Sequence, residues 1–216
     1  MKKNRYLLFE IVLIAVAAVG TTLAYPHLPA VVPRHWGVDG HVNGYSPRWM
    51  LFVFGPGLMA LFTVLSFAGR WLSPKQFSVG NFRATYEQLM LIFVCLMGYL
   101  EVVIVWSAER PHDTSPRQFV FGGVCLFFAL IGNMLGKVRR NFFIGVRTPW
   151  TLANERVWNA THRFAAKVCV VSGLVGLAFV FGGWLRGSIL AILLGALSPV
   201  IYSLAYHKKL ERLGEL

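Results

Sequence analysis

Six apolar segments dominate the sequence and constrain its fold more than any other feature. They lie at roughly residues 5–24, 49–69, 86–107, 118–136, 165–184 and 188–206. A helix of about 20 apolar residues spans the hydrocarbon core of a bilayer. Because lipid offers no hydrogen-bond partner to exposed backbone groups, each segment must be helical. We therefore expect an all-α polytopic membrane protein with six transmembrane helices, the first an uncleaved helix rather than a signal peptide.

The composition agrees with this fold class. Hydrophobic residues make up 56% of the chain and charged residues only 14%, whereas soluble domains carry about 25% charged residues. The net charge of +12 would suggest nucleic acid as a partner for a soluble protein, but basic residues in cytoplasmic loops are ordinary in membrane proteins. We expect the lipid bilayer as a partner, no direct nucleic-acid binding and no cofactor.

The distribution of Lys and Arg predicts the orientation. With the N-terminus inside, sixteen basic residues fall on the cytoplasmic side: Lys2, Lys3, Arg5, Arg70, Lys75, Arg83, Lys137, Arg139, Arg140, Arg147, Arg156, Arg163, Lys167, Lys208, Lys209 and Arg212. Five fall outside: Arg34, Arg48, Arg110, Arg117 and Arg186. The positive-inside rule therefore favours cytoplasmic N- and C-termini.

The outer loop, about residues 25–48, is rich in Pro, Gly, aromatic residues and His. Its prolines exclude a long helix and its glycines supply turns. We interpret it as an ordered cap at the lipid headgroups, with Trp36, Tyr45 and Trp49 at the interface. A metal site formed by His35, Asp39 and His41 is the alternative, although their spacing matches no metal-binding motif.

One carboxylate, Glu101, is expected about four turns into the third helix. A carboxylate in the membrane is costly unless it is paired, protonated or hydrated. We predict that it meets His27, His35 or Arg48 of the outer loop.

The inner loop, about residues 137–164, contains a helix start. Thr148 can cap a helix whose first residue is Pro149. We predict a short amphipathic helix from Trp150 towards Phe164, lying in the cytoplasmic interface. It is either an anchor or a docking and anion-binding surface centred on Arg140 and Arg147. Before this loop, Gly132 and Gly136 predict close helix packing.

Two motifs resemble a known family. The stretch "GNMLGKVRRNFFIGVRTPWTLANERVWNATHR", residues 132–163 and here called the signature loop, resembles the signature of the SdpI family of bacterial integral membrane proteins. The outer loop resembles the small N-terminal domain of unknown function often fused to it, through Leu28-Pro29, Pro33, His35, Gly40 and Tyr45. The chain departs from these patterns at Arg140, where a Pro is usual, and at Ser46-Pro47-Arg48, where a Lys is often found.

The resemblance implies a bacterial plasma membrane protein. It implies an N-terminal region, 1–70, and an SdpI-like region, 71–216. The best-known family member protects its cell from a secreted hydrophobic peptide toxin and holds a cytoplasmic repressor at the membrane when toxin is present. Candidate partner-binding residues in the signature loop are Arg140, Asn141, Gly145, Arg147, Thr148, Pro149, Trp150 and Thr151. Candidate toxin-side residues are His27, His35, Asp39, His41 and Glu101.

Two other functions remain open from the residues. A membrane-embedded metal-dependent hydrolase would use His35, Asp39, His41 and Glu101, but the sequence has no HExxH or Gly-x-Ser-x-Gly motif. A small transporter is compatible with six helices, although no inverted repeat is evident. We therefore favour an immunity and sensor protein over an enzyme.

Overall fold

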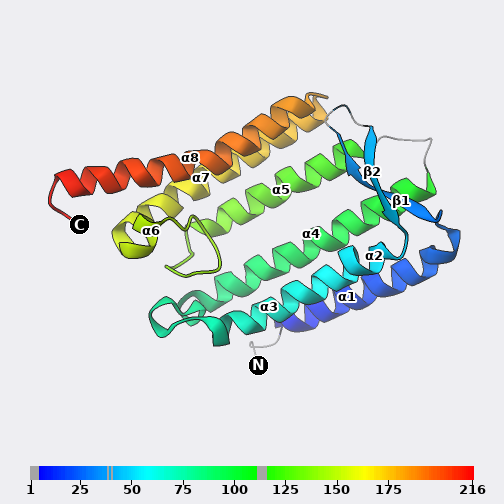
Figure 1. Cartoon of the computed structure of the whole chain (residues 1–216), viewed down its shortest axis with the longest axis horizontal. Helices are drawn as coiled ribbons and strands as arrows, with labels where there is room; N and C mark the ends of the chain where they lie inside the picture. The colour runs from blue at the N-terminus through cyan, green and yellow to red at the C-terminus, as the bar shows by residue number, and fades with distance from the viewer. Residues whose placement is uncertain (1–4, 38, 40, 111–115) are drawn as a thin grey trace. The chain divides into compact units, whose positions relative to one another are not determined.

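The computed structural model describes residues 5–37, 39, 41–110 and 116–216 (Figure 1). Lys2, Lys3 and Gly40, which entered the charge count and the motif above, lie outside the described residues. In chain order the elements are α1 (Arg5–Ala24), β1 (Val31–Trp36), β2 (Val42–Pro47), α2 (Met50–Phe52), α3 (Leu58–Leu72), α4 (Arg83–Glu109), α5 (Arg117–Leu135), α6 (Pro149–Ala153), α7 (Glu155–Phe181) and α8 (Leu185–Arg212). Single 3-10 turns occur at Tyr25–His27, Lys75–Phe77 and Val79–Phe82.

The predicted membrane fold is confirmed. Within the described part of the chain, six helical stretches are long and apolar enough to cross a membrane. They are Arg5–His27, Met50–Gly69, Lys75–Glu109, Arg117–Leu135, Glu155–Phe181 and Leu185–Arg212. Each overlaps one of the six apolar segments, so the chain is an all-α multi-pass membrane protein.

The predicted amphipathic helix from Trp150 to Phe164 is wrong as a single interfacial element. Helix α6 has only five residues and ends at Ala153. Asn154 then adopts an extended backbone (φ −125°, ψ 121°), and its side chain caps α7 by accepting hydrogen bonds from the backbone N–H groups of Arg156 and Val157. The remainder of the predicted amphipathic stretch is therefore the first part of a membrane-spanning helix.

The outer loop contains secondary structure that the sequence analysis did not predict. Strands β1 and β2 form an antiparallel pair with Val32 opposite Ser46 and Trp36 opposite Val42. The register is irregular on either side of His35, as expected of a bulge in a short, proline-containing ribbon. Trp36, which we expected at the lipid headgroups, is buried, whereas Tyr45 and Trp49 are exposed.

The second span is interrupted near its start. A π-helical turn over Val53–Gly57 separates α2 from α3, and Pro56 lies inside it. Because Pro has no N–H and its ring crowds the preceding turn, it removes one helical hydrogen bond and distorts the helix. The backbone N–H of Leu58 donates instead to the carbonyls of Val53 and Gly55. The second span therefore begins with an irregular turn before its regular α-helical part.

The chain forms two compact units. Unit 1 comprises residues Met1–Leu65 and Met90–Val124, and unit 2 comprises Ser66–Leu89 and Cys125–Leu216. In unit 1, buried Leu28 and Val32 of the outer region pack with Leu51 and Ala108. This apolar cluster attaches the hairpin region to the ends of α2 and α4.

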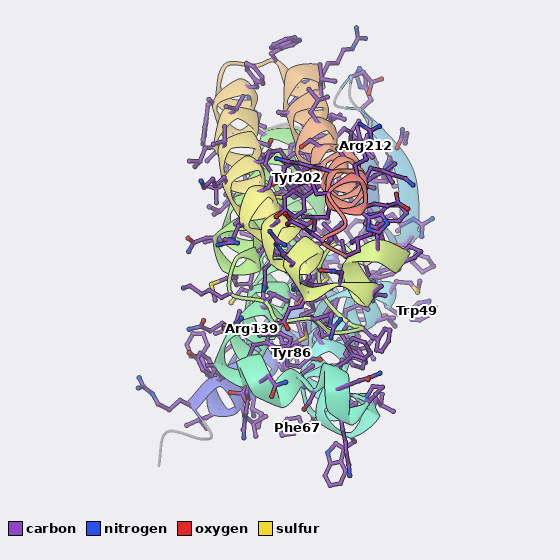
Figure 2. The ribbon with its side chains drawn as sticks, turned by 90° about the vertical axis from the view of Figure 1, so that its left-hand side faces the viewer. Trp49, Phe67, Tyr86, Arg139, Tyr202 and Arg212 are labelled. Atoms are coloured by element: carbon purple, nitrogen blue, oxygen red, sulfur yellow. The ribbon has the colours of Figure 1, made fainter. Side chains whose placement is uncertain are left out.

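In unit 2, α7 and α8 run side by side, drawn yellow and orange to red in Figures 1 and 2. Aromatic rings join them, since Phe164 of α7 stacks on Tyr202 of α8 at 4.4 Å. Glycines bring α5 and α7 close together: a Cβ on Gly132 would lie 2.8 Å from the backbone nitrogen of Val170. A Cβ on Gly173 would lie 2.7 Å from the backbone nitrogen of Ala129. Small residues thus allow close helix packing, as predicted for Gly132.

Candidate functional site

The signature loop in unit 2 is organised around Asn141, which is fully buried. Its side-chain nitrogen donates to the carbonyls of Arg139 (2.7 Å) and Ile144 (3.1 Å). Its side-chain oxygen accepts from the backbone N–H groups of Phe143 (2.7 Å) and Ile144 (2.8 Å). The amide therefore has a partner on each side within the loop and fixes the turn after Arg139.

Gly145 and His162 form the next contact. Gly145 has a backbone φ of +111°, which L side chains rarely adopt. A Cβ at this position would lie 3.0 Å from Cδ2 and 3.2 Å from Cε1 of the His162 ring. The loop backbone thus approaches the histidine more closely than a side chain would permit.

The hydrogen bonds of His162 assign its tautomer. The backbone N–H of Val146 donates to Nε2 at 3.0 Å, so Nε2 must be the acceptor nitrogen. The proton therefore lies on Nδ1, which donates to the carbonyl of Trp158 at 2.9 Å. The ring also stacks on that of Trp158, with centroids 3.9 Å apart. His162 is a buried neutral imidazole with both nitrogens in use.

Helix α6 begins with a capping box. The backbone N–H of Thr151 donates to the Thr148 hydroxyl oxygen at 3.3 Å, and the N–H of Thr148 donates to the Thr151 hydroxyl oxygen at 2.9 Å. Pro149 occupies the first turn of the helix. This confirms the predicted cap and helix start, and it gives both threonines a local structural role.

Two tryptophans attach the loop to neighbouring helices. The indole N–H of Trp150 donates to the Ser203 hydroxyl of α8 at 2.8 Å, and its ring faces that of His207 at 6.1 Å. The indole N–H of Trp158, fully buried in α7, donates to the carbonyl of Val138 at 2.8 Å. The loop is therefore held on both the α7 and α8 sides.

The two arginines at the centre of the predicted docking and anion-binding surface donate to backbone carbonyls. Arg140 donates to the carbonyls of Leu152 (3.1 Å) and Ala153 (3.0 Å) at the end of α6. Its guanidinium also lies 5.2 Å from the centroid of the Phe77 ring, in cation–π geometry. Arg147 donates to the carbonyl of Phe142, although its side chain remains exposed.

The outward face of the signature loop consists of a few side chains. Phe142, with 41% of its surface exposed, packs edge-on against Phe77. Arg147 and Pro149 are also exposed. Arg147 and Pro149 are the exposed members of the candidate set, and Phe142, which was not a candidate, is exposed beside them.

A second feature of unit 2 is a basic pocket of about 450 Å³ formed by the two ends of the signature loop. It is lined by Gly136, Lys137, Val138, Arg139, Asn159 and Arg163. Lys137 and Arg139 were predicted only as cytoplasmic basic residues, and the sequence pattern was not used to group them with Asn159 and Arg163. Their i,i+4 spacing on one helix face was the signal that would have grouped them.

In unit 1, the polar residues of the outer region bind mainly one another. His35 Nδ1 is hydrogen-bonded to the side-chain oxygen of Asn43. Asp39 accepts from the backbone N–H of His41 at 3.1 Å, and its own carbonyl accepts from Arg117 at 2.9 Å. His27 is exposed in the turn after α1. Among the described residues, no three His, Cys, Asp or Glu side chains are grouped so as to hold a metal ion.

Glu101 is buried in unit 1 but pairs differently from our prediction. It accepts a hydrogen bond from the Thr21 hydroxyl of α1, and its carboxyl group fills the space that a Cβ on Gly55 would need. Arg48, a predicted partner, donates instead to the carbonyls of Tyr25 (3.1 Å) and Leu28 (2.8 Å). The reason is that α1 provides a hydroxyl at the same depth as the carboxylate.

Glu101 and Thr21 lie in a largely apolar groove of about 540 Å³. The groove is lined by Leu13, Val16, Ala17, Gly20, Thr21, Met59, Val94, Cys95, Gly98, Tyr99, Glu101, Val102, Val105, Trp106 and Glu109. Most of these side chains belong to α1 and α4. The groove therefore offers an apolar surface with one carboxylate–hydroxyl pair at its wall.

Comparisons with known proteins agree with both motifs. The model of the SdpI/YfhL protein family matches residues 137–203, and the model of a domain of unknown function (DUF1648) matches residues 11–60. The immunity protein SdpI of Bacillus subtilis (strain 168) is 28% identical over 216 residues, which cover 98% of this chain and 99% of that protein. No solved structure matches the chain.

Proposed function

The chain belongs to the SdpI family, and on that premise we propose that it is a membrane immunity protein that protects a bacterial cell against a membrane-active peptide toxin. One observation carries the proposal: the similarity to an immunity protein extends over 98% of this chain rather than over one motif. The six candidate spans support it, because a protein that acts against a membrane-active toxin must reside where the toxin acts.

We place the toxin contact in the apolar groove of unit 1. A hydrophobic peptide in the bilayer gains packing against Leu13, Val16 and Val102, which line the groove. The carboxylate of Glu101 supplies a strong hydrogen-bond acceptor for a polar or cationic group of the peptide. With the N-terminus cytoplasmic, as the Lys and Arg distribution favours, Glu101 lies in the outer half of α4, where an arriving toxin meets it first.

We place the contact with a cytoplasmic repressor on the outward face of the signature loop. Phe142, Arg147 and Pro149 offer an apolar and basic surface there. The inward residues, such as Asn141 and Thr151, support that surface from below. In this proposal, toxin binding changes helix packing near Gly132 and thereby changes the loop that follows it.

The test is protection of a toxin-sensitive bacterium that lacks its own immunity protein. Cells producing the chain are challenged with the toxin against which the Bacillus subtilis relative gives immunity, and survival and membrane potential are measured. We expect the chain to preserve both. Normal membrane levels of the chain without any protection would refute the proposal for this toxin class.

A matched pair of variants tests the groove. Glu101→Gln keeps an acceptor for Thr21 but removes the charge, and we expect it to reduce survival. Glu211→Gln makes the same change on the exposed end of α8, where the carboxylate binds Lys208 at 2.8 Å, and we expect survival to be unchanged. Equal survival of the two variants would exclude a role for the Glu101 charge.

Repressor docking is tested separately from protection. Arg147→Gln is expected to reduce membrane recruitment of a fluorescently tagged repressor encoded beside the gene, while toxin survival stays normal. An equal loss of recruitment and survival, with the chain present at normal membrane levels, would argue against a separate docking face.

A further inference from the structure

Part of the backbone that forms the basic pocket of unit 2 is fixed by hydrogen bonds to buried side chains. One side of the pocket is the segment Lys137–Arg139, which is separated from the end of α5 only by Gly136. The carbonyl of Val138 accepts from the buried indole of Trp158 at 2.8 Å. The carbonyl of Arg139 accepts from the buried amide of Asn141 at 2.7 Å. Two consecutive peptide units are therefore fixed by side chains that are fully buried, so the positions from which Lys137 and Arg139 project are set before any ligand arrives.

The opposite wall is one face of α7. Asn159 and Arg163 lie four residues apart on this helix and line the same pocket. The guanidinium of Arg163 donates through Nε to the carbonyl of Asn159 at 3.3 Å. This contact directs the side chain along the helix and leaves its terminal nitrogens available. The side-chain amide of Asn159 adds a neutral donor to the set.

The charges of the pocket are not neutralised within the described chain. The ion pairs there join Arg83 to Glu87, Arg156 to Glu215 and Lys208 to Glu211, and none includes Lys137, Arg139 or Arg163. Arg140, the neighbouring cation, is already bound to carbonyls of α6. Three cations therefore converge on about 450 Å³ without a carboxylate from the residues described.

We propose that this pocket binds a phosphate group, supplied by the headgroup of an anionic phospholipid. Guanidinium and ammonium groups are the side chains that recognise phosphate oxygens best. The pocket adjoins the end of the α5 span at Leu135 and the first turns of the α7 span. This is the depth at which phosphates of a bilayer lie, and basic pockets between membrane helices bind lipid headgroups there. Figure 2 shows Arg139 on the loop that follows α5.

This site is distinct from the groove and from the outward face of the signature loop. Binding of a phosphate at this site requires no toxin and no repressor, so the test of this site is independent of the test of the immunity proposal. Its consequence is that a bound headgroup connects the end of α5 to α7, and so connects the two ends of the signature loop.

The experiment uses the full-length protein purified in a neutral detergent. Thermal unfolding is followed with three probes: a short-chain phosphatidylglycerol, a short-chain phosphatidylcholine and inorganic phosphate. The pocket variant is Lys137→Gln/Arg139→Gln/Arg163→Gln. The matched control is Lys208→Gln/Lys209→Gln/Arg212→Gln, which removes the same charge from the end of α8. Because the replaced pocket side chains are exposed and the fixed carbonyls belong to the backbone, the pocket variant should unfold like the parent without lipid.

We expect phosphatidylglycerol to raise the melting temperature of the parent and the control, and phosphatidylcholine to raise neither. In the pocket variant the apparent dissociation constant for phosphatidylglycerol should rise by about tenfold or more. If inorganic phosphate but not phosphatidylglycerol raises the melting temperature of the parent, and the pocket variant loses this effect, the pocket binds phosphate and the ligand is the free ion.

Two results would overturn the site. One is an equal loss of the phosphatidylglycerol effect in the pocket and control variants, which would indicate attraction by net charge alone. The other is no shift of the parent with either anionic probe. Should the pocket variant fail to fold, Asn159→Asp replaces it, since a carboxylate at that wall repels a phosphate; unchanged phosphatidylglycerol binding by this variant would contradict the site equally.

Discussion

Gly145→Ala is predicted to destabilise the protein because two separate costs coincide at this residue. The first is conformational: the backbone φ of +111° is strained for any residue with a Cβ, at about 1–3 kcal/mol. The second comes from His162, whose ring lies where the new methyl group would be. That ring is held by Trp158 and cannot turn away without losing its hydrogen bonds.

If the ring moves, the backbone N–H of Val146 loses its acceptor, now 3.0 Å away. A buried donor left without a partner costs about 1–3 kcal/mol. Adding this to the conformational cost gives a loss of about 2–6 kcal/mol in the free energy of unfolding. The assay is reversible unfolding of purified protein by SDS titration from mild detergent, followed by the helical circular dichroism signal.

Gly183→Ala is the matched control. Gly183 also has a positive φ, +79°, but nothing lies within 4 Å of a Cβ built there. This variant therefore isolates the conformational cost, about 1–2 kcal/mol. In a His162→Ala background, Gly145→Ala should cost less than in the parent, because the ring is gone. Equal destabilisation by Gly145→Ala and Gly183→Ala would refute the role assigned to the contact with His162.

Two further predictions use the same unfolding measurement. Trp158→Phe should lower the free energy of unfolding by about 1–3 kcal/mol, because it leaves the buried carbonyl of Val138 without its donor; Trp184→Phe, at a 55% exposed site, should change it by less than about 0.5 kcal/mol. Gly132→Ala should cost about 1–3 kcal/mol, because its Cβ would lie 2.8 Å from a backbone nitrogen of α7. Gly136→Ala should be tolerated, since its nearest contact would be an ordinary 3.5 Å; a larger loss for Gly136→Ala than for Gly132→Ala would contradict the packing described here.

The membrane spans were predictable because each is a continuous apolar run, and hydropathy alone marks such runs. The start of α7 was not predictable from hydropathy, because polar residues in its first turns lower the local hydropathy. Two of those residues, Thr161 and His162, are buried against protein rather than exposed. Hydropathy does not distinguish a polar residue that leaves the membrane from one that is buried against a neighbouring helix. The cap at Asn154 was the local signal for the true helix start.

The hairpin was missed for a different reason. Pro33 and Gly44 both lie within its strands, and these residue types ordinarily argue against a strand. Pairing of Val31 with Pro47 depends on contacts made after the chain has turned, and on burial of Val32 against the ends of two membrane helices. Such non-local packing leaves no short-range sequence pattern. The sequence therefore predicted turns and an ordered cap in this loop, but not the strands.

Within the signature loop, the sequence did not distinguish the residues that are buried from those that are exposed. Thr148 and Pro149 were predicted as a helix start because capping is a local rule. The inward direction of Asn141 and the contact between Gly145 and His162 depend on how the loop folds back onto α7. Asn141 and Arg147 are both polar, so residue type alone does not show which of them is buried. In the structure Asn141 is buried and Arg147 is exposed.

This division determines how mutational data on the signature loop should be interpreted. Loss of survival after replacing Asn141, Gly145 or Thr151 follows from collapse of the loop and carries no information about a partner, since each of these side chains or backbone positions is engaged within unit 2. Only substitutions on the outward face, at Phe142, Arg147 or Pro149, separate docking from folding. A repressor contact is therefore supported by a variant that unfolds like the parent but fails to recruit, and a screen scored by survival alone would select the residues that hold the loop together instead.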